Sequence, residues 1–108
     1  RYPVMDVLIS QNDDMTMGAI EAMQEAGVSF GEGGDVTVIS FDATRDALEL
    51  VKEGRTNVDV ECNPVQGAYV DEIIQKLENG ETVEKYYVVE EVVFTKENAT
   101  AFLEDRKY

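Results

Sequence analysis

The 108-residue sequence lacks histidine and tryptophan, and it contains a single cysteine, Cys62, and two prolines. Without histidine, neither a Cys/His zinc site nor a histidine-based catalytic triad can form within the chain. One cysteine forms no internal disulfide, so the cysteine content does not indicate a redox compartment. No apolar run is long enough to span a bilayer, and no signal-peptide pattern is present. Because the chain starts at Arg1 rather than at methionine, we interpret it as a piece of a longer protein, so these absences leave its location open.

Basic residues are also scarce, since 9 Lys and Arg stand against 23 Asp and Glu and give a formal net charge of −14. Nucleic acid is therefore not an expected partner, because its phosphates attract basic residues and repel acidic ones. Anionic membrane surfaces are disfavoured for the same reason. The acidity does not indicate disorder, because 44% of the residues are hydrophobic and they recur in ordered patterns. The length allows one compact domain at most.

Short apolar runs alternate with amphipathic segments along the chain, which predicts alternating strands and helices. The expected strands are residues 5–10, 36–41 and 57–61. The expected helices begin at Met15, Arg45 and Pro64, with Asn12 or Asp13, Thr44 and Asn63 as their caps, and they end at Gly27, Gly54 and Gly80. Residues 86–95 are expected to form a long strand or crossing segment, and the tail from Lys96 a short helix or frayed end. This order is typical of an α/β fold with a mainly parallel, Rossmann-like sheet.

Polar side chains follow each of the three expected strands. Asn12-Asp13-Asp14 follows the first strand, Asp42 the second, and Glu61-Cys62-Asn63 the third. The carboxyl ends of parallel strands meet at one edge of the sheet, where ligands of such folds bind. Asparagine offers donors and an acceptor and aspartate offers acceptors, which suits the neighbouring hydroxyls of a sugar. The sequence therefore indicates a polyhydroxylated ligand at this edge, although the same residues also cap helices and form turns.

Several motifs in register resemble one protein family. The segment Gln11-Asn12-Asp13-Asp14-Met15-x-Met17-Gly18-Ala19-Ile20 resembles the distal-half signature of bacterial sugar-binding proteins of ABC transporters, of the ribose and galactose type. Asp35-Val36-x-Val38-x-x-Phe41-Asp42 resembles the next strand and its ligand aspartate, and Val60-Glu61-Cys62-Asn63-Pro64 resembles the hinge crossing. Within the family, Glu61-Cys62-Asn63-Pro64 is most similar to the subgroup that binds galactofuranose. The resemblance covers nearly the whole chain.

The resemblance implies an incomplete lobe of a type I periplasmic binding protein. Residues 1–61 are then part of the C-terminal ligand-binding lobe, and residues 62–84 form the hinge crossing and a helix that packs on the N-terminal lobe. Residues 85–108 form the return strand and the C-terminal tail. In this chain alone, the apolar helix face of Val65, Tyr69, Ile73 and Leu77 lacks its expected partner.

The function that the resemblance implies is reversible capture of a monosaccharide, with furanose sugars favoured, and no bond is made or broken. Two lobes close on the sugar, and the closed form delivers it to the membrane permease of the transporter. The implied location is the periplasm or, through a lipid anchor, the outer face of the bacterial cell membrane. Neither a cofactor nor a metal is implied.

Asn12 matches the family's asparagine that hydrogen-bonds the sugar, and Asp42 matches the aspartate that accepts from its hydroxyls. Asp13, Glu61, Cys62 and Asn63 are possible ligand or hinge residues. Cys62 stands where ribose-type members have glutamine, and Glu61 beside it is a possible substitute. Strand alternation, however, points Glu61 to the opposite face.

Two alternatives remain open from the sequence. The ligand-sensing domain of LacI-type transcription regulators has the same fold and a similar Asn-Asp motif, but this chain departs from its pattern at Gly34 and Ser40. The other alternative is a magnesium-dependent phosphoacceptor domain, in which Asp13-Asp14 would bind the metal and Asp42 would accept the phosphoryl group.

Overall fold

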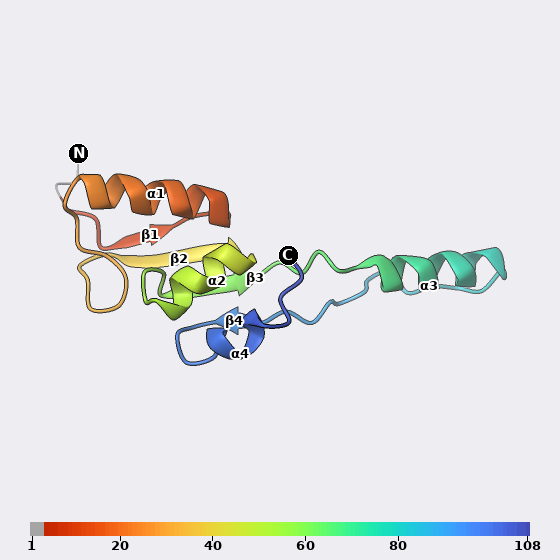
Figure 1. Ribbon diagram of the computed structural model, residues 1–108. Coiled ribbons are helices and arrows are strands. Elements are labelled where there is room, and N and C mark those ends of the chain that lie inside the picture. Colours follow the sequence, from red (N-terminus) through yellow and green to blue (C-terminus); the bar gives the residue numbers. More distant parts are fainter. Residues whose placement is uncertain (1–3) are drawn as a thin grey trace.

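The computed structural model describes residues 4–108, so the start at Arg1 lies outside the described residues. Within this range strands and helices alternate along the chain (Figure 1). The elements are β1 (Val7–Ile9), α1 (Asp13–Glu25), β2 (Thr37–Asp42), α2 (Arg45–Lys52), β3 (Val58–Glu61), α3 (Gly67–Glu78), β4 (Val93–Phe94) and α4 (Ala99–Leu103).

The strands form one sheet in the order β1-β2-β3-β4. The pairs β1–β2 and β2–β3 are parallel, and β4 runs antiparallel to β3. This arrangement confirms the predicted α/β fold with a mainly parallel sheet. In the register of the central pair, Ser40 lies opposite Asp59 and Asp42 lies opposite Glu61. The carboxyl ends of β1, β2 and β3 therefore meet at one edge.

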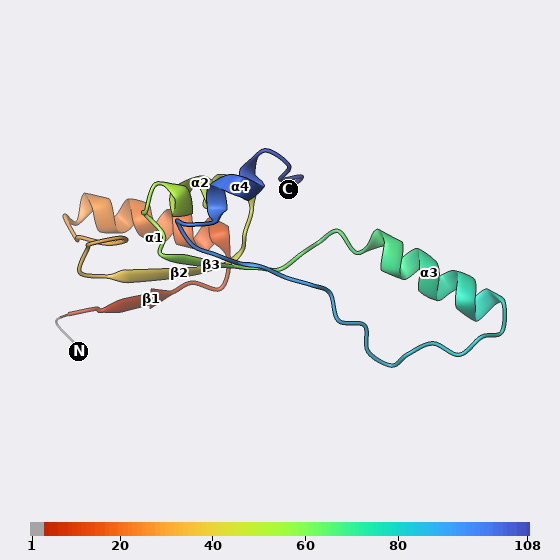
Figure 2. The same cartoon turned by 90° about the horizontal axis from the view of Figure 1, so that it is seen from below.

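Helices α1, α2 and α4 lie on the same face of the sheet, as Figure 2 shows. Their apolar sides cover two clusters of buried residues, of which one is Ile20, Met23, Val36 and Val38 and the other is Ala43, Leu48, Phe94 and Leu103. The opposite face of β1 stays open, because Val7 is 50% and Ile9 63% exposed. The described residues thus form a sheet with helices on one side.

Helix α3 projects away from this body and has no buried residue (Figure 1). The prediction that it starts at Pro64 with Asn63 as its cap is wrong, because the helix begins at Gly67 and its N-cap is Gln66. The Asn63 side chain instead accepts a hydrogen bond of 2.8 Å from the amide of Val65. This local turn uses the Asn63 oxygen before the helix begins.

The segment 86–95 is a crossing segment rather than a long strand, since only Val93 and Phe94 pair with β3. Because β3 ends at Glu61, no neighbouring strand is available to pair with residues 86–91. The tail is a short helix followed by a docked segment rather than a frayed end, since the Tyr108 carbonyl accepts a 2.8 Å bond from the amide of Arg45. Within residues 4–108, no helix combines the length and apolarity needed to cross a membrane.

Two leucines with opposite environments test this description of the core. Leu48 is fully buried, whereas Leu77 on α3 is 54% exposed. We expect Leu48→Ala to lower the free energy of unfolding of this chain by about 2–5 kcal/mol, because the change leaves a cavity. The same change at Leu77 is expected to cost less than about 0.5 kcal/mol. Urea unfolding of both variants measures the difference, and equal losses would contradict the placement of α3 outside the core.

Candidate functional site

An open hollow of about 490 Å³ lies at the carboxyl ends of the strands. It is lined by Ile9, Gln11, Phe41, Asp42 and Cys62. The structure thus brings Asp42 and the exposed Cys62 together at the predicted edge. Gln11 and Phe41 were not among the predicted site residues, although each directly precedes one, and their position at a strand end was the available signal.

Asn12 directly precedes α1 at the same edge. It is the N-cap residue, and its side-chain oxygen accepts a bond of 2.8 Å from the amide of Met15. The two donors of the side-chain amide are separate from this oxygen, so capping and hydrogen bonding to a ligand use different atoms.

The chain turns sharply at residues 42 and 43, which we call the corner. Asp42 has φ 111° and Ala43 has φ 59°, values that residues other than glycine adopt rarely. Such conformations cost about 1–3 kcal/mol each and persist where surrounding contacts determine them. Here the Asp42 carbonyl accepts a bond of 3.3 Å from the amide of Cys62, and the Ala43 side chain is fully buried. Strain of this kind is concentrated at functional sites.

Asp13 supports the corner from inside the lobe. Its side chain is 1% exposed, and one carboxylate oxygen accepts from the backbone amide (2.7 Å) and the hydroxyl (2.8 Å) of Thr44. The other oxygen accepts a bond of 2.6 Å from the hydroxyl of Ser40. Thr44 occupies the predicted cap position of α2, but its side chain donates to Asp13 and makes no cap bond. Asp13 therefore lies behind the open edge, where it ties β2 to the start of α2.

Asp59 is a second buried acid, which the sequence reasoning missed. Its side chain is fully buried, and neither carboxylate oxygen has a hydrogen-bond partner among residues 4–108. Burial and then the negative charge of Asp13 raise the pKa of Asp59 to about 8. The signal for it was available in the sequence, since Asp59 occupies the inward position of the alternating segment Val58-Asp59-Val60.

Burial also raises the pKa of Asp42, and the neighbouring charge of Asp13 adds to this effect. Its carboxyl is nevertheless on the open side of the edge, where it lines the hollow. The arrangement offers acceptor oxygens to hydroxyl groups. Among residues 4–108, no group of three or more acidic, cysteine or histidine side chains is placed to hold a metal ion.

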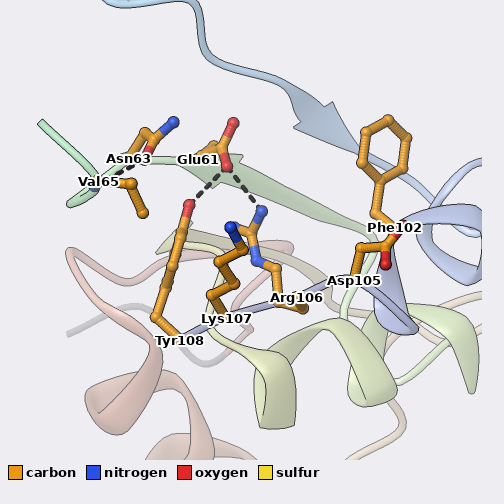
Figure 3. Close-up of a pocket in the computed structure, with 8 residues that line it drawn as sticks. All are labelled: Glu61, Asn63, Val65, Phe102, Asp105, Arg106, Lys107 and Tyr108. Atoms are coloured by element: carbon orange, nitrogen blue, oxygen red, sulfur yellow. Dashed lines mark hydrogen bonds and ion pairs between the residues drawn. The ribbon is translucent and has the colours of Figure 1, made fainter. Parts of the chain in front are cut away.

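Glu61 points away from the hollow and into a second pocket, shown in Figure 3. Its carboxylate accepts from Arg106 (2.6 Å), from the Tyr108 hydroxyl (2.5 Å) and from the amide of Val92 (2.9 Å). Burial disfavours the charged form, but the bonds from Tyr108, Arg106 and Val92 outweigh it and lower the pKa of Glu61. Asn63 lines the same pocket. Arg106 and Tyr108 were missed because no local pattern links the tail to β3.

No family model matches the sequence. Among curated proteins, the chain is 31% identical over 98 residues to the fructose import binding protein of Bifidobacterium longum. The aligned region covers 91% of this chain and 29% of that protein. It is 36% identical over 90 residues to the ribose import binding protein of Salmonella typhimurium, covering 82% of this chain and 29% of the relative. The chain thus spans about three tenths of the length of the curated relatives it matches.

Solved structures show the same relationship. A crystal structure from Mycobacterium smegmatis in complex with β-D-fucofuranose is 37% identical, with a TM-score of 0.86 over 98% of this chain and 34% of that one. A galactofuranose-binding protein matches at 29% identity and a TM-score of 0.80, over 94% of this chain and 34% of the other. The arabinose-transporter binding protein of Shewanella, bound to arabinofuranose, matches at 30% identity and 0.79, over 94% and 33%.

The chain belongs to the periplasmic sugar-binding proteins of bacterial ABC importers, and it corresponds to a part of such a protein. This confirms the family resemblance and the expectation of an incomplete α/β lobe. The comparisons give no support to the regulator or the phosphoacceptor alternative.

The buried carboxyl of Asp59 predicts a pH dependence of stability. In the unfolded chain this carboxyl loses its proton near pH 3.8, whereas in the folded chain it keeps the proton up to about pH 8. Between these values the folded state binds the extra proton, so stability falls as the pH rises, by up to about 1.4 kcal/mol per unit. Asp59→Asn is expected to flatten this slope, because an amide carries no ionisable proton.

Urea unfolding at several pH values between about 4 and 9 measures the slope. Asp35→Asn is the matched control, since Asp35 is exposed and the same atoms change. A slope that survives in Asp59→Asn and equals that of the control would contradict a protonated Asp59.

Proposed function

We propose that the longer protein containing this chain captures a monosaccharide between two lobes and delivers it to an ABC permease. The observation that carries the proposal is the hollow at the carboxyl edge, where Asp42 is presented by a strained and buried corner. The Asp42 carboxylate accepts hydrogen bonds from sugar hydroxyls, and the Asn12 amide donates to a ring or hydroxyl oxygen. A charged acceptor forms stronger bonds with hydroxyls than a neutral one.

The ligand that we favour is a furanose sugar. Three matched structures carry names that point in this direction, namely the fucofuranose complex, the galactofuranose-binding protein and the arabinofuranose complex. Phe41 supports the proposal, because it adds an apolar surface to the hollow against which the C–H face of a sugar packs. Cys62 contributes a small side chain there, which leaves space for the ligand.

The second lobe is proposed to cover surfaces that are open in this chain. Residues 62–84 are proposed as the hinge crossing and a helix that packs on the N-terminal lobe, because α3 has no buried residue and exposes Val70, Ile74 and Leu77. Residues 1–61 then belong to the C-terminal lobe, and residues 85–108 return to it. Closure about the hinge encloses the sugar.

The proposed protein is a binding protein rather than an enzyme. Its proposed location is the periplasm or, through a lipid anchor, the outer face of the bacterial cell membrane. The matched structure from Shewanella is a periplasmic binding protein component, which supports the periplasmic location.

Asp42 provides the direct test of this proposal. In the longer protein, Asp42→Ala is expected to abolish monosaccharide binding, because it removes the charged acceptor. Asp42→Asn tolerates the same backbone conformation and is expected to weaken binding by roughly 10- to 100-fold, the range for a bond to a charged group. Isothermal titration against furanose and pyranose sugars measures both losses.

The control is Asp35→Ala, which removes an exposed carboxyl outside the hollow and should leave affinity unchanged. If the unmodified longer protein binds no sugar in the panel, or if Asp42→Ala binds as well as the unmodified protein, the proposed function is wrong.

A further inference from the structure

We propose that Arg106 is a positioning residue for sugar binding, because it holds the Ala43 carbonyl and thereby fixes the direction of the Asp42 carboxylate. This inference rests on the proposed function, and it assigns a role to the C-terminal tail, which lies outside the hollow.

The Arg106 guanidinium connects the Ala43 carbonyl with the Glu61 carboxylate, and neither Ala43 nor Glu61 lines the hollow. Its Nε donates to the Ala43 carbonyl at 2.7 Å, and its Nη2 donates to the same oxygen. Its Nη1 forms an ion pair of 2.6 Å with Glu61, which Figure 3 shows. The side chains of Arg106 and Glu61 are only 7% and 6% exposed, so water competes little for these bonds.

The position of Ala43 explains why this contact matters for the site. Ala43 directly follows Asp42, and both residues have positive φ values. The orientation of the Ala43 peptide group determines how the chain leaves the corner, and the Thr44 amide beyond it is bound by Asp13. Without the two donors on the Ala43 carbonyl, the strained corner is free to relax, and the Asp42 side chain moves with it.

The guanidinium is itself held in one orientation. It lies 5.0 Å from the centroid of the Phe94 ring and 4.1 Å from that of the Tyr108 ring. The Tyr108 hydroxyl donates to Glu61 at 2.5 Å, and the Tyr108 carbonyl accepts from the Arg45 amide at 2.8 Å. A planar fork with several donors satisfies all of these contacts together, whereas the ammonium group of lysine does not.

The test uses the longer protein that contains this chain. Arg106→Lys keeps the positive charge beside Glu61 but loses the paired donors to the Ala43 carbonyl. We expect its Kd for the sugar that the unmodified protein binds to rise about tenfold or more, with a small change in the melting temperature of the unliganded form. Tyr108→Phe removes only the hydroxyl bond to Glu61 and is expected to raise the Kd less than Arg106→Lys does.

Lys107→Gln is the matched control. It removes a positive charge from the same tail, but Lys107 is exposed and makes no bond to the corner. Its Kd is expected to equal that of the unmodified protein. An equal loss in Lys107→Gln would mean that the charge of the tail acts on the ligand, which would overturn the role of Arg106.

A double variant separates positioning from a general loss of structure. If Arg106 acts through Asp42, Asp42→Asn combined with Arg106→Lys raises the Kd by less than the product of the two single increases. If the two Kd increases multiply, or if Arg106→Lys binds like the unmodified protein, the inference is wrong while the proposed function stands. If the unmodified protein binds no sugar, the proposed function is wrong and the inference fails with it.

Discussion

The strained corner at Asp42 and Ala43 is the constraint on which the rest of the lobe depends. The backbone there has positive φ at two successive non-glycine residues, and contacts from three directions maintain it. Asp13 on α1 accepts from the amide of Thr44, the residue after the corner. Arg106 in the tail donates to the Ala43 carbonyl, and the amide of Cys62 donates to the Asp42 carbonyl. Each bond contributes about 0.5–1.5 kcal/mol, or more where a charge takes part, so several together offset the strain. The ends of β2 and β3, the start of α2 and the tail are thus all positioned around one turn.

Buried acids of this acidic lobe differ in their surroundings, and for Asp59 and Glu61 the pKa shifts in opposite directions as a result. The Asp13 carboxylate accepts three hydrogen bonds from Ser40 and Thr44. Asp59, on β3, has no hydrogen-bond partner among residues 4–108, and burial and the charge of Asp13 raise its pKa. Glu61 is less deeply buried and has Tyr108 and Arg106 as donors, and its pKa falls. Net charge and composition do not distinguish Asp59 from Glu61, because each of them counts as one negative charge in the sequence.

Local patterns predicted the elements whose signals are local. The apolar run of β2 and the helical face and glycine end of α1 lie within a few residues of the observed bounds. Asn12 is one of the two caps that the sequence allowed for α1. Asn63 was misleading because its side chain can either cap a helix or close a local turn. In the structure it closes a turn by accepting from the amide of Val65, and the helix begins later, at Gly67. Arg106 and Tyr108 lie 45 and 47 residues from Glu61, so only the folded chain brings them together. Asp42 and Cys62 were found because parallel strand ends meet at an edge, whereas Asp59 was present in the alternation and was overlooked.

The attachment of α3 has a mechanical consequence. The chain leaves the sheet after Glu61 and returns at Val92, and these two residues are joined by a backbone bond of 2.9 Å and by the bond from the Val92 amide to the Glu61 carboxylate. Both connections to α3 therefore start from one fixed point, side by side (Figure 2). Because both connections are anchored at this point, we expect them to resist translation of α3 relative to the sheet. Bending and twisting of α3 about the axis of the two connections meet less resistance. Torsion angles at residues 62–66 and 79–91 would absorb such a rotation, and the carboxyl edge of the sheet would keep its shape.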